Sequence, residues 1–388
     1  MTDYTNATTD RLRKLLGGLA SRTPIQQAII ALESGDRSFR WVGAAGETDS
    51  DGTPVREETP FFLASIDKLF NATVAMLLNE SGRLDLDVPI ATYLPSTVTH
   101  GLHQFGGMDY SESITVRHLL SHTSGLADWL EDYPKGRPCL IDRLLDMGDM
   151  TFTIENVAAV VREQLKPHFP PQDPFSKRPK VRYSDTNYML LIGIIEALTG
   201  EPLHQVQEQM LFKPLDLRHT YFPGYSQPMD PTPKPMILRA NGRPLHIPLF
   251  IRSVRGMYST IADTLTFLRK LMRNEVFQKP GTLASMQKHW HRFGFPLDRA
   301  ALRSPSWPVE YGLGIMRFRL PRFFTLMRPL PPVLGHTGST GCWLFYCPKW
   351  DMLLAGSVDE VTAGAVPYRI IPKILNILRS SDGDPSKR

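Results

Sequence analysis

Strand-like segments lie near both ends of this 388-residue chain, and the long region between them is rich in helix signals. Residues 26–45 predict a hairpin, because an apolar run, a Ser-Gly-Asp turn and a second run follow one another. Residues 335–358 predict two further strands joined by a Pro-Lys-Trp-Asp turn. We therefore expect one α/β lobe built from residues 1–84 and 251–388, and a mostly helical lobe inserted at residues 85–250.

The composition, with 42% apolar and 21% charged residues, suits a globular protein with a large core. The net charge of +5 comes from scattered basic residues, which argues against nucleic acid as a partner. No apolar run reaches the roughly eighteen residues of a membrane span. The N-terminal segment lacks the basic-then-apolar order of a secretory signal, so we expect a cytoplasmic protein. Cys139, Cys342 and Cys347 show no metal-ligand spacing and are expected to be free, mostly buried thiols.

The best-patterned helix is predicted to run from Ser65 to a stop at Gly82, because its apolar residues recur at helical spacing. The proline-rich stretch 223–248 predicts a long ordered loop. Further predicted helices cover residues 10–20, 114–121, 154–165, 186–199, 260–273 and 367–379.

Ser65 and Lys68 are the first candidates for chemistry. Residues three apart share a helix face, so the amine can reach the hydroxyl, and a serine at a helix N-terminus lies where the helix dipole favours an oxyanion. An unassisted serine needs a base, and a partly desolvated lysine with a lowered pKa can act as one. The same spacing recurs at Ser285 and Lys288, but only Ser65 opens a long apolar helix.

Tyr183 and Asp185 are the second candidates, because they stand in a loop just before a predicted helix. A phenol beside cationic groups can transfer protons. The competing interpretation is that Tyr183 packs in the core and Asp185 caps the helix.

The segment 335–339, Gly-His-Thr-Gly-Ser, is the third candidate. Glycines on both sides of a polar pair indicate that something approaches the backbone closely. The main-chain N–H groups of Ser65 and Ser339 would then be natural oxyanion donors. The competing interpretation is a glycine-rich turn with a satisfied histidine.

In this order, the segments SIDK, YSD and HTG resemble the three motifs of the serine β-lactamase and penicillin-binding-protein superfamily. Its class C β-lactamase-like branch, which includes esterases and D-aminopeptidases, is the most similar group. The resemblance covers roughly residues 57–358. It implies an α+β, β-lactamase-like two-lobe fold, in which helices flank a central antiparallel sheet. Other matching segments are LDLDVPIATYLP (84–95), ITVRHLLSHTSGL (114–126), PLDLRHTYF (214–222), RGMYSTIADTLTFL (255–268) and YGLGI (311–315).

The resemblance also implies roles for single residues. Ser65 would be acylated, Lys68 would share its proton, and Tyr183 would relay protons to the leaving group and later help to activate water. No cofactor or metal is implied. The residues expected at the oxyanion and substrate-binding positions are Asp185, His336, Thr337, Gly338 and Ser339.

Two of these residues depart from the β-lactamase pattern. Asp185 stands where the β-lactamases have Asn, and His336 stands where they have Lys. A neutral imidazole is a poorer partner for an anion than an ammonium, and Asp185 would repel a carboxylate. The expected substrate is therefore neutral or amine-bearing. His122 also matches the family, with a structural role.

Large side chains in the loops are candidates to line an acyl pocket, and the competing interpretation is core packing. One of them lies in the apolar stretch 323–327. These candidates are Trp129, Tyr133, Phe250 and Phe324.

The chain is thus expected to be a serine hydrolase that cleaves a small-molecule ester, or an amide, through an acyl-enzyme on Ser65. One alternative is a D-amino-acid peptidase. Another is an acyltransferase that passes the same acyl group to an alcohol, which water-excluding loops would favour. A non-catalytic binding protein is the alternative from a different class, but a binding pocket has no need of Ser65, Lys68 and Tyr183 together.

Overall fold

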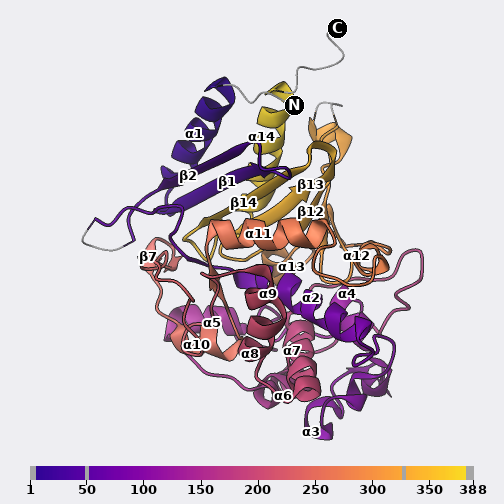
Figure 1. Ribbon diagram of the computed structural model, residues 1–388. Helices are drawn as coiled ribbons and strands as arrows, with labels where there is room; N and C mark the ends of the chain where they lie inside the picture. Colours follow the sequence, from indigo (N-terminus) through magenta and orange to yellow (C-terminus); the bar gives the residue numbers. More distant parts are fainter. Residues whose placement is uncertain (1–5, 49–51, 326–328, 382–388) are drawn as a thin grey trace.

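The computed structural model describes residues 6–48, 52–325 and 329–381, and a sheet of eight strands lies at the centre of this part (Figure 1). Every neighbouring pair of these strands is antiparallel. The predicted α+β class with a central antiparallel sheet is confirmed. In sheet order the strands are β2 (Arg40–Ala45), β1 (Ala28–Ser34), β14 (Met352–Val358), β13 (Trp343–Cys347), β12 (Val333–Thr337), β11 (Met316–Phe318), β10 (Val309–Tyr311) and β9 (His291–Arg292).

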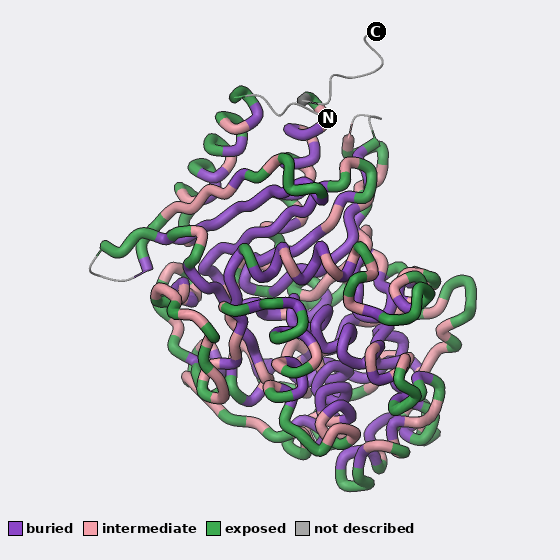
Figure 2. The backbone as a smooth tube through the Cα atoms, in the orientation of Figure 1, coloured by how far each residue is buried: buried purple, intermediate pink, exposed green. Residues whose placement is uncertain are grey.

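The central sheet is buried on both faces (Figure 2). Side chains alternate along a strand, so Ile29 and Ala31 of β1 belong to one hydrophobic core while Ile30 and Leu32 belong to another. The two ends of the chain meet here, since β1 pairs with β14 along its whole length. The helices on the sheet are α1 (Asn6–Ala20) and α14 (Val366–Ser381) on one face and α11 (Ile261–Met272) on the other.

The remaining helices gather beyond α11, on the side of the sheet away from α1 and α14 (Figure 1). Two of them, α2 (Asp67–Glu80) and α7 (Asp185–Thr199), are mostly buried and pack together. The predicted lobe boundaries at residues 84 and 250 stay a prediction. The other helices are α3 (Ser96–Thr99), α4 (Val116–Ser121), α5 (Leu140–Met147), α6 (Ile154–Gln164), α8 (Leu203–Gln207), α9 (Lys213–Leu215), α10 (Pro248–Ser253), α12 (Gly281–Met286) and α13 (Arg299–Arg303).

The sequence missed the short strands. Neither β9, β10 nor β11 was predicted, because strands of two or three residues show too little alternation to be recognised. The segment 335–358 was predicted as two strands, but it also contains the end of β12. The stretch 223–248 is largely irregular, with one two-stranded hairpin formed by β6 (Arg239–Ala240) and β7 (Arg243–Pro244) and the first residue of α10.

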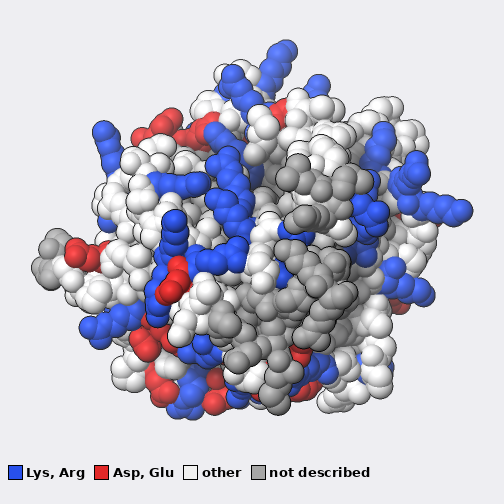
Figure 3. Space-filling model, turned by 90° about the horizontal axis from the view of Figure 1, so that it is seen from above, with Lys and Arg blue, Asp and Glu red and all other residues white. Residues whose placement is uncertain are grey.

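The structure also bears on the predictions about the cysteines, the membrane spans and the distribution of charge. None of the three cysteines forms a disulfide, and all three are buried. Within the described ranges, no helix has the length and apolar character that crossing a membrane requires. Figure 3 views the face over α1 and α14, where Lys and Arg side chains are spread widely and Asp and Glu lie mainly towards the edges.

Candidate active site

Ser65 lies in a 3₁₀ turn, Ala64–Ile66, that leads directly into α2. Ala64 has φ = 43°, in the left-handed region, so the backbone bends sharply just before Ser65. Nζ of Lys68 donates a hydrogen bond of 3.0 Å to Oγ of Ser65. The two side chains therefore meet in the structure.

The second motif of the same spacing is arranged differently. Oγ of Ser285 donates to the carbonyl of Thr282 at 2.7 Å, and Lys288 is exposed. A serine engaged in this way has no base beside it. The structure thus brings a lysine to Ser65 and not to Ser285.

Lys68 is buried and paired with Asp185, whose Oδ1 lies 2.6 Å from Nζ. Burial by itself lowers the pKa of Lys68, but Asp185, Tyr183 and Asp67 raise it, and the result lies well above the ordinary value for lysine. The prediction of a lowered pKa is therefore wrong for this arrangement. It considered burial and left out the carboxylate that the fold brings to the amine.

Tyr183 is only 4% exposed. Burial raises its pKa well above the usual value, although the positive charge of Lys68 opposes the rise. Nζ of Lys68 lies 5.4 Å from the centre of the ring. The hydroxyl has no partner at regular hydrogen-bond geometry among the described residues. Tyr183 thus offers a neutral phenol that keeps its proton at neutral pH.

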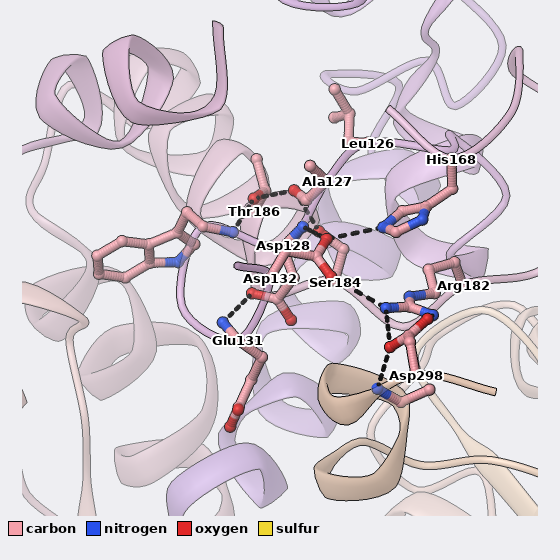
Figure 4. A network of polar contacts seen from close by, with 12 residues as sticks. Leu126, Ala127, Asp128, Glu131, Asp132, His168, Arg182, Ser184, Thr186 and Asp298 are labelled. Carbon is pink, nitrogen blue, oxygen red and sulfur yellow. Dashed lines mark hydrogen bonds and ion pairs between the residues drawn. The ribbon is translucent and has the colours of Figure 1, made fainter. Parts of the chain in front are cut away.

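Anchoring and functional side chains alternate where the chain enters α7, which begins at Asp185. Ser184, which has extended dihedral angles, donates to the carbonyl of Ala127 at 3.1 Å. Thr186 donates to the same carbonyl at 2.7 Å (Figure 4). Asp185 lies between these two anchors and Tyr183 lies just before them, and both interact with Lys68.

Arg182 continues this alternation with ion pairs (Figure 4). Its guanidinium lies 2.9 Å from a carboxylate oxygen of Asp132 and 2.7 Å from one of Asp298. Asp132 is also 2.7 Å from Nε2 of His168. This network attaches the segment to loops far away in the sequence, and thereby holds Tyr183 in place.

Gly338 brings the end of β12 against the turn that carries Ser65. A Cβ at this position would lie 2.9 Å from both the Cβ of Ala64 and the carbonyl oxygen of Leu63, so a larger residue would not fit. The carbonyl of Gly338 accepts from the N–H of Gly341 at 3.0 Å. Because a trans peptide directs its N–H opposite to its carbonyl, the N–H of Ser339 points away from the turn that this bond closes between Gly338 and Gly341.

A second N–H is available at Ser65 itself, because the first N–H groups of a helix lack partners within it. Together with the N–H of Ser339, it forms the candidate pair of oxyanion donors that the sequence predicts. Ser339 is exposed, whereas Thr337 and Gly338 are buried. An oxyanion role for Ser339 stays a prediction that this geometry permits.

His336 is placed differently from the sequence expectation of a substrate contact. Its imidazole is fully buried. Nδ1 lies 2.7 Å from the carbonyl oxygen of Thr337, and Nε2 lies 2.9 Å from the hydroxyl of Tyr311. Burial, together with the charge of Lys68, lowers the pKa of His336 to about 3, so the ring is neutral. Both ring nitrogens are bonded inside the protein, which leaves neither for a substrate.

His122 packs against Tyr183 and bonds the segment that carries it. Its Nδ1 accepts from the N–H of Ser184 at 3.2 Å and from the amide of Asn187 at 3.0 Å. Its ring centre lies 4.4 Å from that of Tyr183. This arrangement agrees with the structural role expected for His122.

The predicted pocket residues do not share one environment. Trp129 is 1% exposed and its ring packs near Phe250, which is also buried, so the structure favours core packing for this pair. Tyr133 is partly buried and donates to a carboxylate of Asp142. Phe324 is 56% exposed at the surface. Residues 326 and 327 of the same apolar stretch lie outside the described residues. Substrate contacts by these side chains stay a prediction.

Sequence reasoning missed three residues around Lys68. The ring centre of Tyr188 lies 5.5 Å from Nζ of Lys68, and Tyr311 bonds to His336. Asp67 is nearly buried, and burial raises its pKa to about 7. Each residue falls in a segment that carries the family resemblance, but only the fold shows that they meet. Among the described residues, no group of three or more His, Cys, Asp or Glu is arranged to hold a metal ion.

Comparisons with known proteins agree with this geometry. The Beta-lactamase family model matches residues 4–359. Esterase EstB of Burkholderia gladioli is 26% identical over 335 residues, which are 78% of this chain and 76% of the esterase. Penicillin-binding protein 4 of Amycolatopsis lactamdurans is 29% identical over 173 residues, or 44% of this chain and 38% of the relative. The chain thus spans most of the esterase but well under half of that penicillin-binding protein.

Two solved structures cover nearly the whole chain. A D-stereospecific amidohydrolase from Streptomyces sp. has a TM-score of 0.69 and 28% identity, covering 96% of this chain and 98% of its own. The D-amino acid amidase from Ochrobactrum anthropi SV3, complexed with D-phenylalanine, has a TM-score of 0.73 and 20% identity, covering 97% and 100%. The second likeness shows the shared fold.

Proposed function

The chain belongs to the beta-lactamase family and is a serine hydrolase, and we propose that it cleaves an ester of a small molecule through an acyl-enzyme on Ser65. The observation that carries this proposal is the position of Lys68. Its amine lies 3.0 Å from Oγ of Ser65 and 2.6 Å from Asp185. Activation of a hydroxyl by an adjacent amine is what an otherwise weak serine nucleophile requires.

The proposed reaction moves one proton through the site. Oγ of Ser65 forms a bond to the substrate carbonyl carbon while its proton passes to the neutral form of Lys68. The N–H groups of Ser65 and Ser339 stabilise the resulting oxyanion. Tyr183 gives its proton to the leaving group and is reprotonated by Lys68, and the bond to the leaving group breaks. Water then releases the acyl group by the same steps in reverse.

A covalent label tests the proposal. Incubation with a fluorophosphonate should label Ser65, as mapped by mass spectrometry of the peptides, and p-nitrophenyl acetate should be turned over. If the wild-type protein is neither labelled nor active, it is not an acyl-enzyme hydrolase of this kind.

An amide of an amine-bearing substrate is the second candidate, and one observation favours it. The side chain of Asp185 is 20% exposed, so it is open to a substrate ammonium as well as to Lys68. The D-stereospecific amidohydrolase among the similar structures cleaves amides by name. A panel of p-nitrophenyl esters beside D- and L-aminoacyl anilides separates the two. Faster turnover of D-aminoacyl anilides than of esters would favour the amidase.

Nitrocefin should be hydrolysed weakly or not at all. A β-lactam carries a carboxylate, and the two ring nitrogens of His336 are both bonded within the protein. Asp185 would also repel that carboxylate. The measurement is the rate of nitrocefin opening relative to p-nitrophenyl acetate. Efficient opening would contradict this account of the site.

Asp185→Asn should shift the pH–rate profile to lower pH. Asp185 is the largest of the influences that raise the pKa of Lys68, so its loss lowers that pKa. The neutral amine is the form that accepts the proton of Ser65, and its fraction rises as pH passes through the pKa. The alkaline limb of kcat/KM should therefore begin at lower pH in the variant. An unmoved limb would contradict the influence of Asp185 on the pKa of Lys68, whereas loss of activity at every pH would show that the Asp185 carboxylate itself is required.

A further inference from the structure

We propose that Tyr311 and His336 are positioning residues that hold the end of β12 in the orientation in which Ser339 can bind the oxyanion. This inference rests on the proposed acyl-enzyme function. It gives a role to a buried polar chain that neither the nucleophile nor the proton transfers use. Neither residue contacts the reacting atoms in this proposal, and both act through the backbone of β12.

A network of hydrogen bonds links three buried side chains, Tyr188, Tyr311 and His336, to one backbone carbonyl. The hydroxyl oxygens of Tyr188 and Tyr311 lie 3.2 Å apart. The hydroxyl of Tyr311 lies 2.9 Å from Nε2 of His336, and Nδ1 of His336 lies 2.7 Å from the carbonyl oxygen of Thr337. The three side chains are at most 3% exposed. In such a buried place an unpaired polar group costs free energy, so the bonds are retained.

Only one arrangement of protons satisfies this chain. The carbonyl of Thr337 can only accept, so Nδ1 of His336 carries the proton and Nε2 holds a lone pair. Tyr311 must then donate to Nε2, and its oxygen accepts from Tyr188. The hydroxyl of Tyr188 is shared with the carbonyl of Leu120 at 3.4 Å. The carbonyl of Thr337 therefore selects the tautomer of His336, and Tyr311 pairs the lone pair that this tautomer leaves on Nε2.

The carbonyl of Thr337 has no strand neighbour to bond. The N–H of Gly338 donates to the carbonyl of Cys342 at 2.9 Å, towards β13. Backbone groups alternate between the two edges of an antiparallel strand, so the carbonyl of Thr337 faces the opposite edge. At that edge β11 begins only at Met316, which is opposite Gly335, so β11 does not extend to Thr337. The imidazole of His336 supplies the donor that a neighbouring strand would otherwise give to this carbonyl.

The bond from His336 reaches the oxyanion donor through two peptide units. One contains the carbonyl of Thr337 and the N–H of Gly338, and both groups are bonded. The next contains the carbonyl of Gly338, bonded to Gly341, and the N–H of Ser339. If the imidazole bond is lost, the carbonyl of Thr337 loses its partner and the first peptide unit can rotate more freely. The direction of the Ser339 N–H then becomes less defined. An oxyanion hole depends on donors that are oriented before the reaction.

Tyr311→Phe tests this inference, because it removes the hydroxyl and keeps the ring, which also packs 4.7 Å from the ring centre of His122. We expect kcat to fall by about tenfold, less than the 10²–10³ lost when an oxyanion donor is removed outright. KM should stay unchanged. Long-range ¹⁵N–¹H correlation spectra should show the His336 proton on Nδ1 in the wild type, and the Nε2 signal should shift in the variant, because its lone pair has lost the Tyr311 hydroxyl.

Two variants of His336 extend the test independently of Tyr311. The amide nitrogen of Asn corresponds in position to Nδ1, whereas that of Gln corresponds to Nε2. His336→Asn should therefore keep more of the wild-type kcat than His336→Gln does, although both remove the imidazole. Tyr346→Phe is the matched control, since it removes a hydroxyl that donates to Asp351 and is not part of the Tyr188–Tyr311–His336 network. Its kcat should equal that of the wild type.

The inference is overturned if Tyr311→Phe and His336→Gln both keep the wild-type kcat, or if the wild-type His336 carries its proton on Nε2. Labelling of Ser65 in the wild type would in that case leave the acyl-enzyme function intact. If instead the wild type is not labelled at Ser65, the proposed function itself fails. The two failures are thus separate results.

Discussion

Ser65→Ala is expected to abolish acylation and to lower kcat by on the order of 10⁴–10⁶, the range seen when a catalytic serine nucleophile is removed. The hydroxyl accepts a hydrogen bond from Lys68. The methyl group of alanine occupies nearly the same space, so α2 should pack as before. Fluorophosphonate labelling and the burst of p-nitrophenol measure acylation, and a thermal melt reports on the fold.

Ser285→Ala is the matched control for this variant, because it removes the serine of the second motif. Its hydroxyl bonds only the carbonyl of Thr282, so labelling and turnover should match the wild type. Labelling that persists in Ser65→Ala and disappears in Ser285→Ala would transfer the nucleophile to the other motif.

Tyr183→Phe is expected to lower kcat by about 10²–10⁴, the usual contribution of a general acid or base. The effect should depend on the leaving group, since an acidic phenol departs without a proton and an alkoxide does not. The loss should therefore be larger for an ethyl ester than for a p-nitrophenyl ester of the same acid. Equal losses for the two esters, or near-normal rates, would remove Tyr183 from leaving-group protonation.

The stability of Tyr183→Phe provides an internal control. The phenol hydroxyl is buried and lacks a regular hydrogen-bond partner among the described residues, so its removal breaks no hydrogen bond of regular geometry there. The ring still packs on His122. We expect a melting temperature equal to or above that of the wild type, so that a loss of rate is not a loss of fold.

Much of the fold could be predicted because its signals are local. The hairpin β1–β2 and the helices α2 and α7 are formed where the apolar spacing predicted them. The short strands β9 to β11 were missed, because they are strands only through pairing with β12 and its neighbours. Their residues carry no pattern that a single sequence can show.

The candidate site divides in the same way. The contact between Ser65 and Lys68 could be predicted, because three residues along a helix fix their distance. The burial of His336 could not, because its partner Tyr311 comes from another strand of the sheet. The role of Gly338 was partly visible, since the sequence indicated a close approach, and only the structure shows that Cys342, Ala64 and Leu63 are the residues that approach.

The sequence by itself determined that a serine and a lysine share one face at the start of a buried helix. The same serine–lysine spacing also occurs at Ser285. The long apolar helix after Ser65 distinguished the first pair from the second. Only the tertiary structure decided the charge on Lys68. The electrostatic field at an amine depends on distances in space, and the fold places Asp185 2.6 Å from Nζ although it is far away along the chain. Burial is the largest single influence and lowers the pKa of Lys68, but Asp185, Tyr183 and Asp67 together outweigh it.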